Sequence, residues 1–199
     1  MNTIDINAAN REQVRKSILD QASAILSQEG PHALSMRKLS EKVGASTIVL
    51  YTYFKDKQDI LNELYQEGFA RLQADLEVVS AGTDPMDYVM ALGRAYHRSA
   101  VANATYYQIM FTQCVPGFMP SEASLESSKT CFAVLRNAVQ RCMDAGAIEK
   151  ASATHTAQVL WGTLHGIISL ELFGYLGSSA MGEARLEQAI QTIKQGFSK

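Results

Sequence analysis

Apolar residues recur at intervals of three and four along most of the chain, which is the spacing typical of amphipathic α-helices. Between residues 10 and 28 this spacing places five apolar side chains on one face: Val14, Ile18, Ala22, Ile25 and Leu26. Gly30 and Pro31 follow directly and favour the end of a helix. We therefore expect an amphipathic helix over residues 10–28.

Polar residues that cap helices precede the next apolar stretches. Ser35, Ser46 and Asp56 can each accept hydrogen bonds from the free amide groups at the start of a following helix. These signals predict a helix after Ser35, a short helix from Ser46 to about Tyr53, and a longer helix from Asp56 to about Val79.

The rest of the chain continues with helical spacing. Asp84 and Pro85 are typical of a helix start, because proline is favoured at the first helical position. The apolar stretches predict helices at residues 85–104, 105–113, 121–145, 152–176 and 182–197. No stretch longer than a few residues alternates between apolar and polar positions, as a half-buried strand would. The predicted fold class is therefore all-α.

The segment from Met36 to Lys55 has the pattern of a helix-turn-helix, in which two short helices pack across a tight turn. Gly44 occupies the turn, and the small Ser40 lies one helical turn earlier, where the helices would cross closely. Apolar residues can pack inward from both helices: Leu39, Val43, Leu50 and Tyr53. The second helix would turn three residues outward: Thr47, Ile48 and Val49. An ordinary helical hairpin is the alternative interpretation.

Composition and charge are consistent with a folded protein that has one basic segment. The 199 residues are 47% hydrophobic and 19% charged, which is enough apolar material for a core. The formal net charge is −2, yet residues 32–57 contain five basic and two acidic residues. This local excess suits a surface that contacts phosphates, although a solvated helix face can have the same composition.

Five short blocks between residues 11 and 61 carry a more specific signal. They are Ser35-Met36-Arg37, Leu39-Ser40, Gly44-Ala45-Ser46, Leu50-Tyr51-Thr52-Tyr53-Phe54 and Lys57-Gln58-Asp59-Ile60-Leu61. In order and spacing these blocks resemble the N-terminal domain of the TetR family of transcription regulators, apart from Ser40, where the family usually has alanine. The resemblance implies a helix-turn-helix three-helix domain over residues 1–60 that binds double-stranded operator DNA, and a ligand-binding and dimerisation bundle over residues 61–199.

The same resemblance implies DNA-binding roles for individual residues. Several would cap a helix, pack or contact the phosphate backbone: Ser35, Ser46, Tyr51, Tyr53 and Lys57. Arg37 would reach a guanine edge. The residues that would contact the base edges are mainly Thr47, Ile48 and Val49, whose methyl groups favour contacts with thymine methyls.

The C-terminal part contains Trp161, His165 and Gly166 within an apolar stretch, residues 160–172. This stretch, with residues 104–111 and 145–148, resembles a class of TetR-like C-terminal domains that have a W…HG signature. The resemblance implies an all-helical bundle that binds a small-molecule effector and forms a homodimer.

We expect the effector to lie among the four helices predicted between residues 85 and 176. Candidate contacts, each of which alone is more commonly a core residue, are Tyr96, His97, Tyr107, Met110, Phe111, Cys114, Phe132, Trp161 and His165. Because this set offers methionine and aromatic surface with few polar groups, it favours an apolar or aromatic effector.

The last two predicted helices suggest where two subunits would meet. Residues 152–170 contain no Asp, Glu, Lys or Arg, so this helix has more apolar surface than one small subunit easily covers. Pairing both helices with their copies gives a four-helix interface. The expected interface residues are Leu164, Ile168, Leu186, Ile190, Ile193 and Phe197. Burial within one subunit is the alternative.

Other classes of protein have less support. The chain has no GxSxG, P-loop or HExxH motif, so no catalytic residue is assigned, and we expect neither a metal nor a cofactor. Three cysteines without CxxC spacing, Cys114, Cys131 and Cys142, indicate neither a disulfide framework nor a zinc site. With no signal-like N-terminus and no anchored membrane span, we expect a cytoplasmic protein. The resemblance implies a DNA-binding regulator, usually a repressor that its ligand releases, and an activator is the open alternative. A helical small-molecule-binding protein or an enzyme without DNA binding is the alternative.

Overall fold

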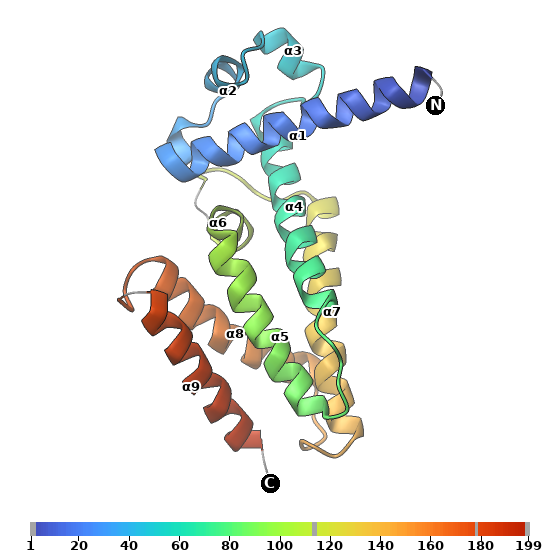
Figure 1. Cartoon of the computed structure of the whole chain (residues 1–199), viewed down its shortest axis with the longest axis vertical. Coiled ribbons are helices and arrows are strands. Elements are labelled where there is room, and N and C mark those ends of the chain that lie inside the picture. The colour runs from blue at the N-terminus through green and yellow to red at the C-terminus, as the bar shows by residue number, and fades with distance from the viewer. Residues whose placement is uncertain (1–2, 113–114, 178, 198–199) are drawn as a thin grey trace. The chain divides into compact units, whose positions relative to one another are not determined.

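The computed structural model describes the backbone of residues 3–112, 115–177 and 179–197, and the side chains of residues 10–112, 115–177 and 181–196. Over these residues the chain forms nine α-helices and one short 3-10 helix and contains no strand (Figure 1). The elements are α1 (Thr3–Glu29), η1 (Pro31–Ala33), α2 (Met36–Val43), α3 (Thr47–Tyr51), α4 (Lys57–Glu77), α5 (Pro85–Ala102), α6 (Ala104–Phe111), α7 (Glu122–Asp144), α8 (Ala153–Leu172) and α9 (Ser179–Phe197). The predicted all-α fold class is confirmed. None of the described helices is long and apolar enough to cross a membrane.

The predicted caps start the helices. The Ser35 hydroxyl accepts a hydrogen bond from the Lys38 amide at 3.2 Å, and the Ser46 hydroxyl accepts one from the Val49 amide at 3.3 Å. The carboxylates of Asp56 and Asp84 cap α4 and α5 in the same way. Each cap satisfies amide groups that the first helical turn leaves without an intrahelical partner.

Two helix ends differ from the predicted ones by four residues or more. The first helix begins at Thr3 rather than near residue 10, because no glycine or proline interrupts the chain before Gly30. The helix predicted to reach residue 176 ends at Leu172, where Gly174 adopts a left-handed φ of 80°. The amides of Gly174 and Tyr175 there bond back to the carbonyls of Glu171 and Leu170, which closes the helix as a Schellman motif.

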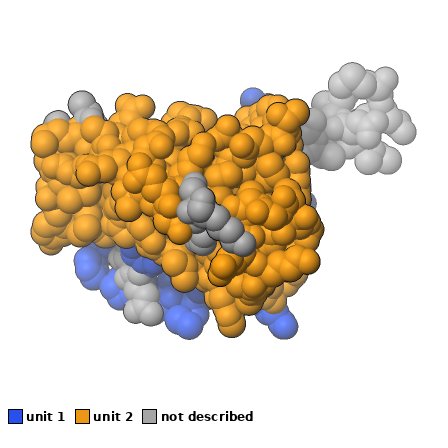
Figure 2. Space-filling view, turned by 90° about the horizontal axis from the view of Figure 1, so that it is seen from below, with its two compact units in different colours: residues 1–68, 105–125 blue, residues 69–104, 126–199 orange. Residues whose placement is uncertain are grey.

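The chain divides into two compact units, coloured separately in Figure 2. Unit 1 contains Met1–Gly68 and Thr105–Leu125, and unit 2 contains Phe69–Ala104 and Glu126–Lys199. Helix α4 passes without interruption from unit 1 into unit 2. The domain boundary predicted between residues 60 and 61 falls inside α4 and stays a prediction.

The core of unit 1 is built from its first four helices. Nine of its apolar side chains are at most 1% exposed: Ile18, Ala22, Ile25, Leu39, Leu50, Phe54, Ile60, Leu61 and Leu64. Full burial of one such aliphatic or aromatic side chain stabilises a fold by about 1.5–3 kcal/mol relative to exposure. The short helix α3 is therefore held by a shared core rather than by its own hydrogen bonds.

In unit 2, α5, α8 and α9 pack against one another. Gly93 of α5 permits the close approach, because a Cβ atom there would lie 2.9 Å from Cδ1 of Leu164. Arg94 of α5 forms a bidentate ion pair with Glu187 of α9, with N–O distances of 2.7 and 2.8 Å. These contacts join three helices that are distant in sequence into one bundle.

Candidate nucleic-acid interface and sensing region

Helix α3 presents an unusually apolar exposed face for its length. Ile48 is 76% exposed, Tyr51 54% and Val49 42%, whereas Leu50 between them is fully buried. Thr47 is partly exposed at the start of the same helix. Because exposed apolar groups of this kind commonly mark a binding surface, the geometry fits the outward positions expected of a recognition helix.

The turn between α2 and α3 fixes the direction of this face. Gly44 has a φ of 73°, and the amides of Gly44 and Ala45 both bond to the carbonyl of Ser40. Ser40 is buried, and its hydroxyl donates a hydrogen bond of 2.7 Å to the Arg37 carbonyl. A glycine in the turn and a small buried residue one turn earlier are the features that the helix-turn-helix pattern predicts.

Two arginines of α1, which the sequence pattern did not identify, hold the far end of α3. Arg11 donates a hydrogen bond of 3.1 Å to the Thr52 carbonyl, and its guanidinium lies 5.6 Å from the centre of the Tyr53 ring. Arg15 lies over the Phe54 ring and pairs with Glu63, a hydrogen bond that raises the pKa of the Arg15 guanidinium. The carbonyl that Arg11 contacts is 41 residues away, so no local signal could reveal it.

The basic residues proposed to contact DNA already have partners within unit 1. Arg37 is highly exposed and pairs with Glu41 at 3.2 Å. The half-exposed Lys57 has its ammonium 3.5 Å from the Pro31 carbonyl. Ser35 and Ser46 cap their helices, and Tyr53 lies against Arg11, as described above. The structure brings all nine predicted residues into unit 1, and their roles on DNA stay predictions.

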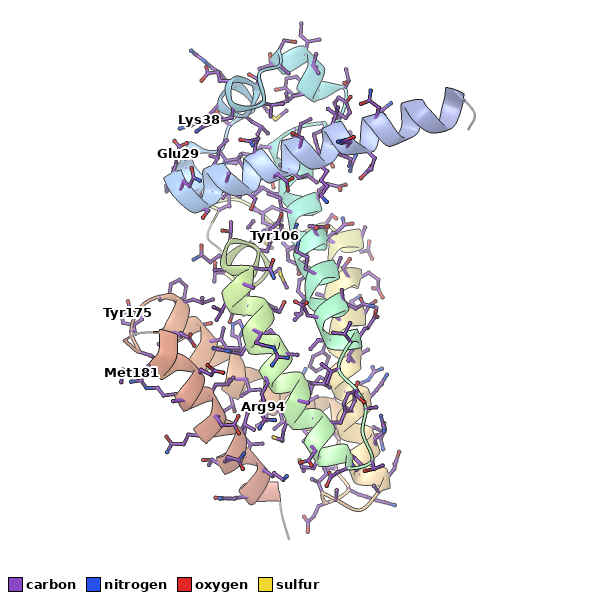
Figure 3. All side chains as sticks on the ribbon, viewed as in Figure 1. Glu29, Lys38, Arg94, Tyr106, Tyr175 and Met181 are labelled. Carbon is purple, nitrogen blue, oxygen red and sulfur yellow. The ribbon has the colours of Figure 1, made fainter. Side chains whose placement is uncertain are left out.

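Within unit 1, α4 contacts the segment 105–125 through hydrogen bonds of a polar side chain and through close packing at a glycine. The side-chain oxygen Oδ1 of Asn62 accepts hydrogen bonds from the Ser121 amide and the Ser124 hydroxyl, both at 2.8 Å. Gly68 lets α6 approach, because a Cβ atom there would lie 2.5 Å from the Met110 sulfur and 3.3 Å from Cβ of Tyr106, labelled in Figure 3. Helix α4, which begins at the helix-turn-helix, is thus in direct contact with α6 and the start of α7.

Four of the predicted effector contacts form one cluster in unit 2, which we call the aromatic cluster: Tyr96, Phe132, Trp161 and His165. The Trp161 indole N–H donates to the Tyr96 hydroxyl at 3.2 Å, and that hydroxyl lies 2.9 Å from Nδ1 of His165. Burial lowers the pKa of His165, so its ring is neutral near pH 7. The cluster combines aromatic surface with a few polar atoms, as sites for small organic molecules do.

The other predicted effector contacts lie elsewhere. His97 is buried in unit 2 and pairs with the buried Glu171 at 2.8 Å, a partner that the sequence did not reveal because it lies 74 residues away. Tyr107, Met110 and Phe111 belong to unit 1, where the rings of Tyr107 and Phe111 meet edge to face. Cys114 lies outside the described residues.

The two described cysteines are buried in α7 and carry free thiols. Burial raises the pKa of the Cys131 thiol to about 12 and also raises that of Cys142. A thiol that stays protonated at neutral pH is a poor nucleophile, so these two positions are unsuited to redox sensing.

The predicted interface residues are mostly core residues of unit 2. Leu164, Ile168, Leu186 and Ile190 are at most 8% exposed within a single chain, and Ile193 is partly exposed. The Phe197 side chain lies outside the described residues. The exposed apolar side chains of α8, α9 and the turn between them are different ones: Val159, Leu170, Phe173, Tyr175 and Met181, of which Figure 3 labels Tyr175 and Met181.

Comparisons with known proteins agree with this arrangement. Residues 18–64 match the family model of bacterial regulatory proteins of the tetR family. Residues 89–193, more than half of the chain, match the tetracyclin repressor-like C-terminal domain.

Individual relatives are similar to parts of the chain. The uncharacterized HTH-type transcriptional regulator YobS of Bacillus subtilis is 32% identical over 97 residues, 47% of this chain and 49% of that protein. The HTH-type transcriptional regulator Mb1846 of Mycobacterium bovis is 24% identical over 111 residues, 54% of this chain and 47% of that protein. The chain spans about half or less of the length of the curated relatives it matches.

Solved structures are similar over nearly the whole chain. A protein of unknown function from Rhodococcus sp. RHA1 has 27% identity and a TM-score of 0.81, covering 94% of this chain and 96% of that one. The TetR family regulator PfmR from Thermus thermophilus has 19% identity and a TM-score of 0.75, covering 92% and 99%, and shares the fold. With both family models matched in their order along the chain, the protein belongs to the TetR family of bacterial transcriptional regulators.

Proposed function

We propose that the protein is a ligand-responsive repressor that binds a palindromic operator as a homodimer and is released by a small apolar or aromatic effector. The exposed face of α3 is the observation that carries the proposal. Two aliphatic side chains and a tyrosine are displayed there on a helix whose other side is locked into the core. Exposed apolar side chains contribute little to the stability of the fold, so we infer that these residues contact another molecule.

On DNA, the methyl groups of Thr47, Ile48 and Val49 would contact thymine methyls in the major groove. Tyr51 and Lys57 would bind phosphates and set the register, with Ser35 and Ser46 nearby at their helix caps. Arg37 would leave Glu41 for a guanine edge. Two copies related by a two-fold axis would read half-sites about 34–36 Å apart or a multiple of that spacing.

A selection of bound sequences from random duplexes tests DNA recognition directly. The wild type is expected to enrich an inverted repeat, and Ile48→Ala is expected to change the preferred bases by about 1–3 kcal/mol. Val78→Ala is the matched control, because Val78 is also a highly exposed aliphatic residue but lies at the end of α4. Failure of the wild type to enrich any sequence would refute the proposal and favour a helical ligand-binding protein or enzyme.

The outer face of α8 supports the homodimer. We define this face as Val159, Gly162, Gly166 and Leu170, which share one side of the helix opposite the core residues Leu160 and Leu164. A Cβ atom at Gly162 or Gly166 would meet nothing within 4 Å. Two glycines one turn apart, flanked by exposed apolar residues, would let the same helix of a second subunit approach closely.

The aromatic cluster supports an effector site in unit 2. An apolar or aromatic molecule that inserts beside Trp161 would disturb the hydrogen bonds of Tyr96 and His165, and α4 would carry the change to the helix-turn-helix. A coupling of about 1–3 kcal/mol between effector and operator is expected. Compounds that quench Trp161 fluorescence, the emission of the single tryptophan, are then tested for release of operator DNA. A compound that binds tightly without changing operator affinity would contradict this mechanism.

A further inference from the structure

The carboxylate of Glu29, the last residue of α1, pairs with two lysines of α2. It contacts the Lys38 ammonium, and the Lys42 ammonium lies 3.5 Å from its other oxygen. Figure 3 shows Glu29 and Lys38 side by side, where the end of α1 meets α2. We call Glu29, Lys38 and Lys42 the Glu29 clamp.

Two charges of the clamp, those of Glu29 and Lys38, are placed against the dipoles of their own helices. Glu29 lies at the C-terminal end of α1, where a negative charge is unfavourable, and Lys38 lies in the first turn of α2, where a positive charge is unfavourable. Each group is stabilised by the other, and the Lys38 hydrogen bond lowers the pKa of Glu29. The dipole of α2 therefore does not account for a lysine at this position.

The clamp is open to solvent and belongs to the same helix-turn-helix as the exposed face of α3. The side chains of Lys38 and Glu29 are 34% and 31% exposed, so another anion can reach the lysine. The third basic residue of α2, Arg37, is also paired with a carboxylate, that of Glu41. Every basic side chain of α2 thus faces a carboxylate.

We propose that Glu29 is an internal competitor for DNA phosphates: it holds Lys38 and Lys42 in the free protein and releases them to the phosphate backbone on binding. The inference rests on the proposed DNA-binding function. A carboxylate and a phosphodiester are alternative acceptors for the same ammonium groups. The competition lowers affinity for all DNA by the free energy needed to break the clamp, because phosphate contacts do not depend on the base sequence. Glu29 is therefore a residue that limits how tightly the protein binds DNA through phosphates.

The test measures wild type and Glu29→Gln on the selected operator and on a scrambled duplex, at salt concentrations from about 50 to 300 mM. Glu29→Gln is expected to bind both duplexes about 3–10-fold more tightly at low salt, by a similar factor on each. The slope of log K against log salt is expected to be steeper by about one in Glu29→Gln than in the wild type. In the wild type, the Glu29 carboxylate that DNA binding releases takes up a cation, and a glutamine does not.

Asp20→Asn is the matched control, since it removes the same charge from an exposed position of the same helix. A gain equal to that of Asp20→Asn would overturn the clamp and indicate a general charge effect. A loss of affinity in Glu29→Gln would also overturn it and show that Glu29 positions the lysines for DNA. Lys38→Gln separates the cases further, because it is expected to weaken DNA binding more in the Glu29→Gln background than in the wild type.

The outcomes also separate this inference from the proposed function. A wild type that binds both duplexes equally would refute operator recognition, while the comparison on the scrambled duplex would still decide the clamp. A wild type that binds neither duplex would refute both.

Discussion

Ion pairs differ in how much they contribute to the free energy of unfolding, and the contribution of the pair of Arg94 and Glu187 is the clearest to measure. The guanidinium of Arg94 lowers the pKa of Glu187 from 4.5 to about 2. Because the folded-state pKa lies below the unfolded one, the pair stabilises the fold fully above pH 4.5 and loses its contribution as the pH falls toward 2.

Glu187→Gln should therefore lower the free energy of unfolding near neutral pH. The side chains are 38% and 44% exposed, so solvent screening limits the effect to about 1 kcal/mol or less. Urea unfolding measured from neutral pH down to about pH 3 should show the difference from wild type shrinking with acidity. Glu126→Gln, which removes the more exposed pair with Lys129, should show almost no difference at any pH. A difference for Glu187→Gln that grows on acidification would contradict this account.

Gly44 allows a second measurement at the scale of one residue. Its φ of 73° is unfavourable for any residue with a Cβ atom, although the space around it is open. Gly44→Ala should therefore destabilise the fold by about 1–2 kcal/mol through backbone strain alone. Gly196→Ala, in open space within α9, should leave stability unchanged or slightly raised, as measured by thermal unfolding. Equal effects of the two substitutions would exclude strain at Gly44.

The sequence predicted residues whose partners are close in the chain. Ser35, Ser46 and Asp84 were predicted as caps because each bonds to an amide two or three residues later. Arg11 and Glu171 were missed because their partners lie 41 and 74 residues away. Hydrophobic periodicity contains no information about such pairs.

At the scale of helices, the sequence predicted that each helix exists but not how far it extends. Predicted and observed helices correspond one to one over the described residues, because apolar spacing and caps are properties of the local sequence. The first helix is longer than its apolar stripe, since continuing a helix needs no core contact. The end of α8 is set by the left-handed backbone at Gly174. The apolar residues on both sides of Gly174 continue the helical pattern, so the sequence did not predict this end.

The position of α3 depends on α1, and this dependence is testable. Arg11→Gln removes both the hydrogen bond to the Thr52 carbonyl and the cation over the Tyr53 ring. Because both contacts are at the surface, we expect a loss of stability of about 1 kcal/mol or less, but a loss of operator affinity of about 3–10-fold.

Arg11→Lys distinguishes positioning from charge. A lysine keeps the charge but lacks the planar, multiply donating guanidinium. If Arg11 acts by positioning α3, Arg11→Lys should lose specific binding almost as much as Arg11→Gln, with the salt dependence unchanged. Full rescue by lysine would show instead that Arg11 contributes charge near a phosphate.

For the whole molecule, the sequence could not reveal which face of α8 belongs to the core. The helix is apolar on most sides, so Leu164 and Ile168 were as plausible at an interface as Val159 or Leu170. Only the packing of α5 and α9 against α8 assigns Leu164 and Ile168 to the core. A charged substitution at a core position such as Ile190 would therefore unfold unit 2 and say nothing about the dimer.

The proposed dimer can be tested instead on the outer face of α8. In the single chain, Gly162→Leu combined with Gly166→Leu should be tolerated, because both positions open to empty space and leucine favours a helix. In a dimer with closely packed α8 helices, the same side chains would force the helices apart. Light scattering should therefore give twice 21.8 kDa for the wild type and 21.8 kDa for the folded double variant.

Val159→Glu should separate the subunits in the same way, because it places a charge within the proposed interface. Val101→Glu is its matched control, since Val101 is an exposed valine of α5. Both separated variants should lose operator binding although α2 and α3 are unchanged, because one recognition helix reads too few base pairs for a specific site. A folded Gly162→Leu/Gly166→Leu protein that stays dimeric would place the interface on another surface. A wild-type monomer that binds a palindrome with full specificity would refute the dimer.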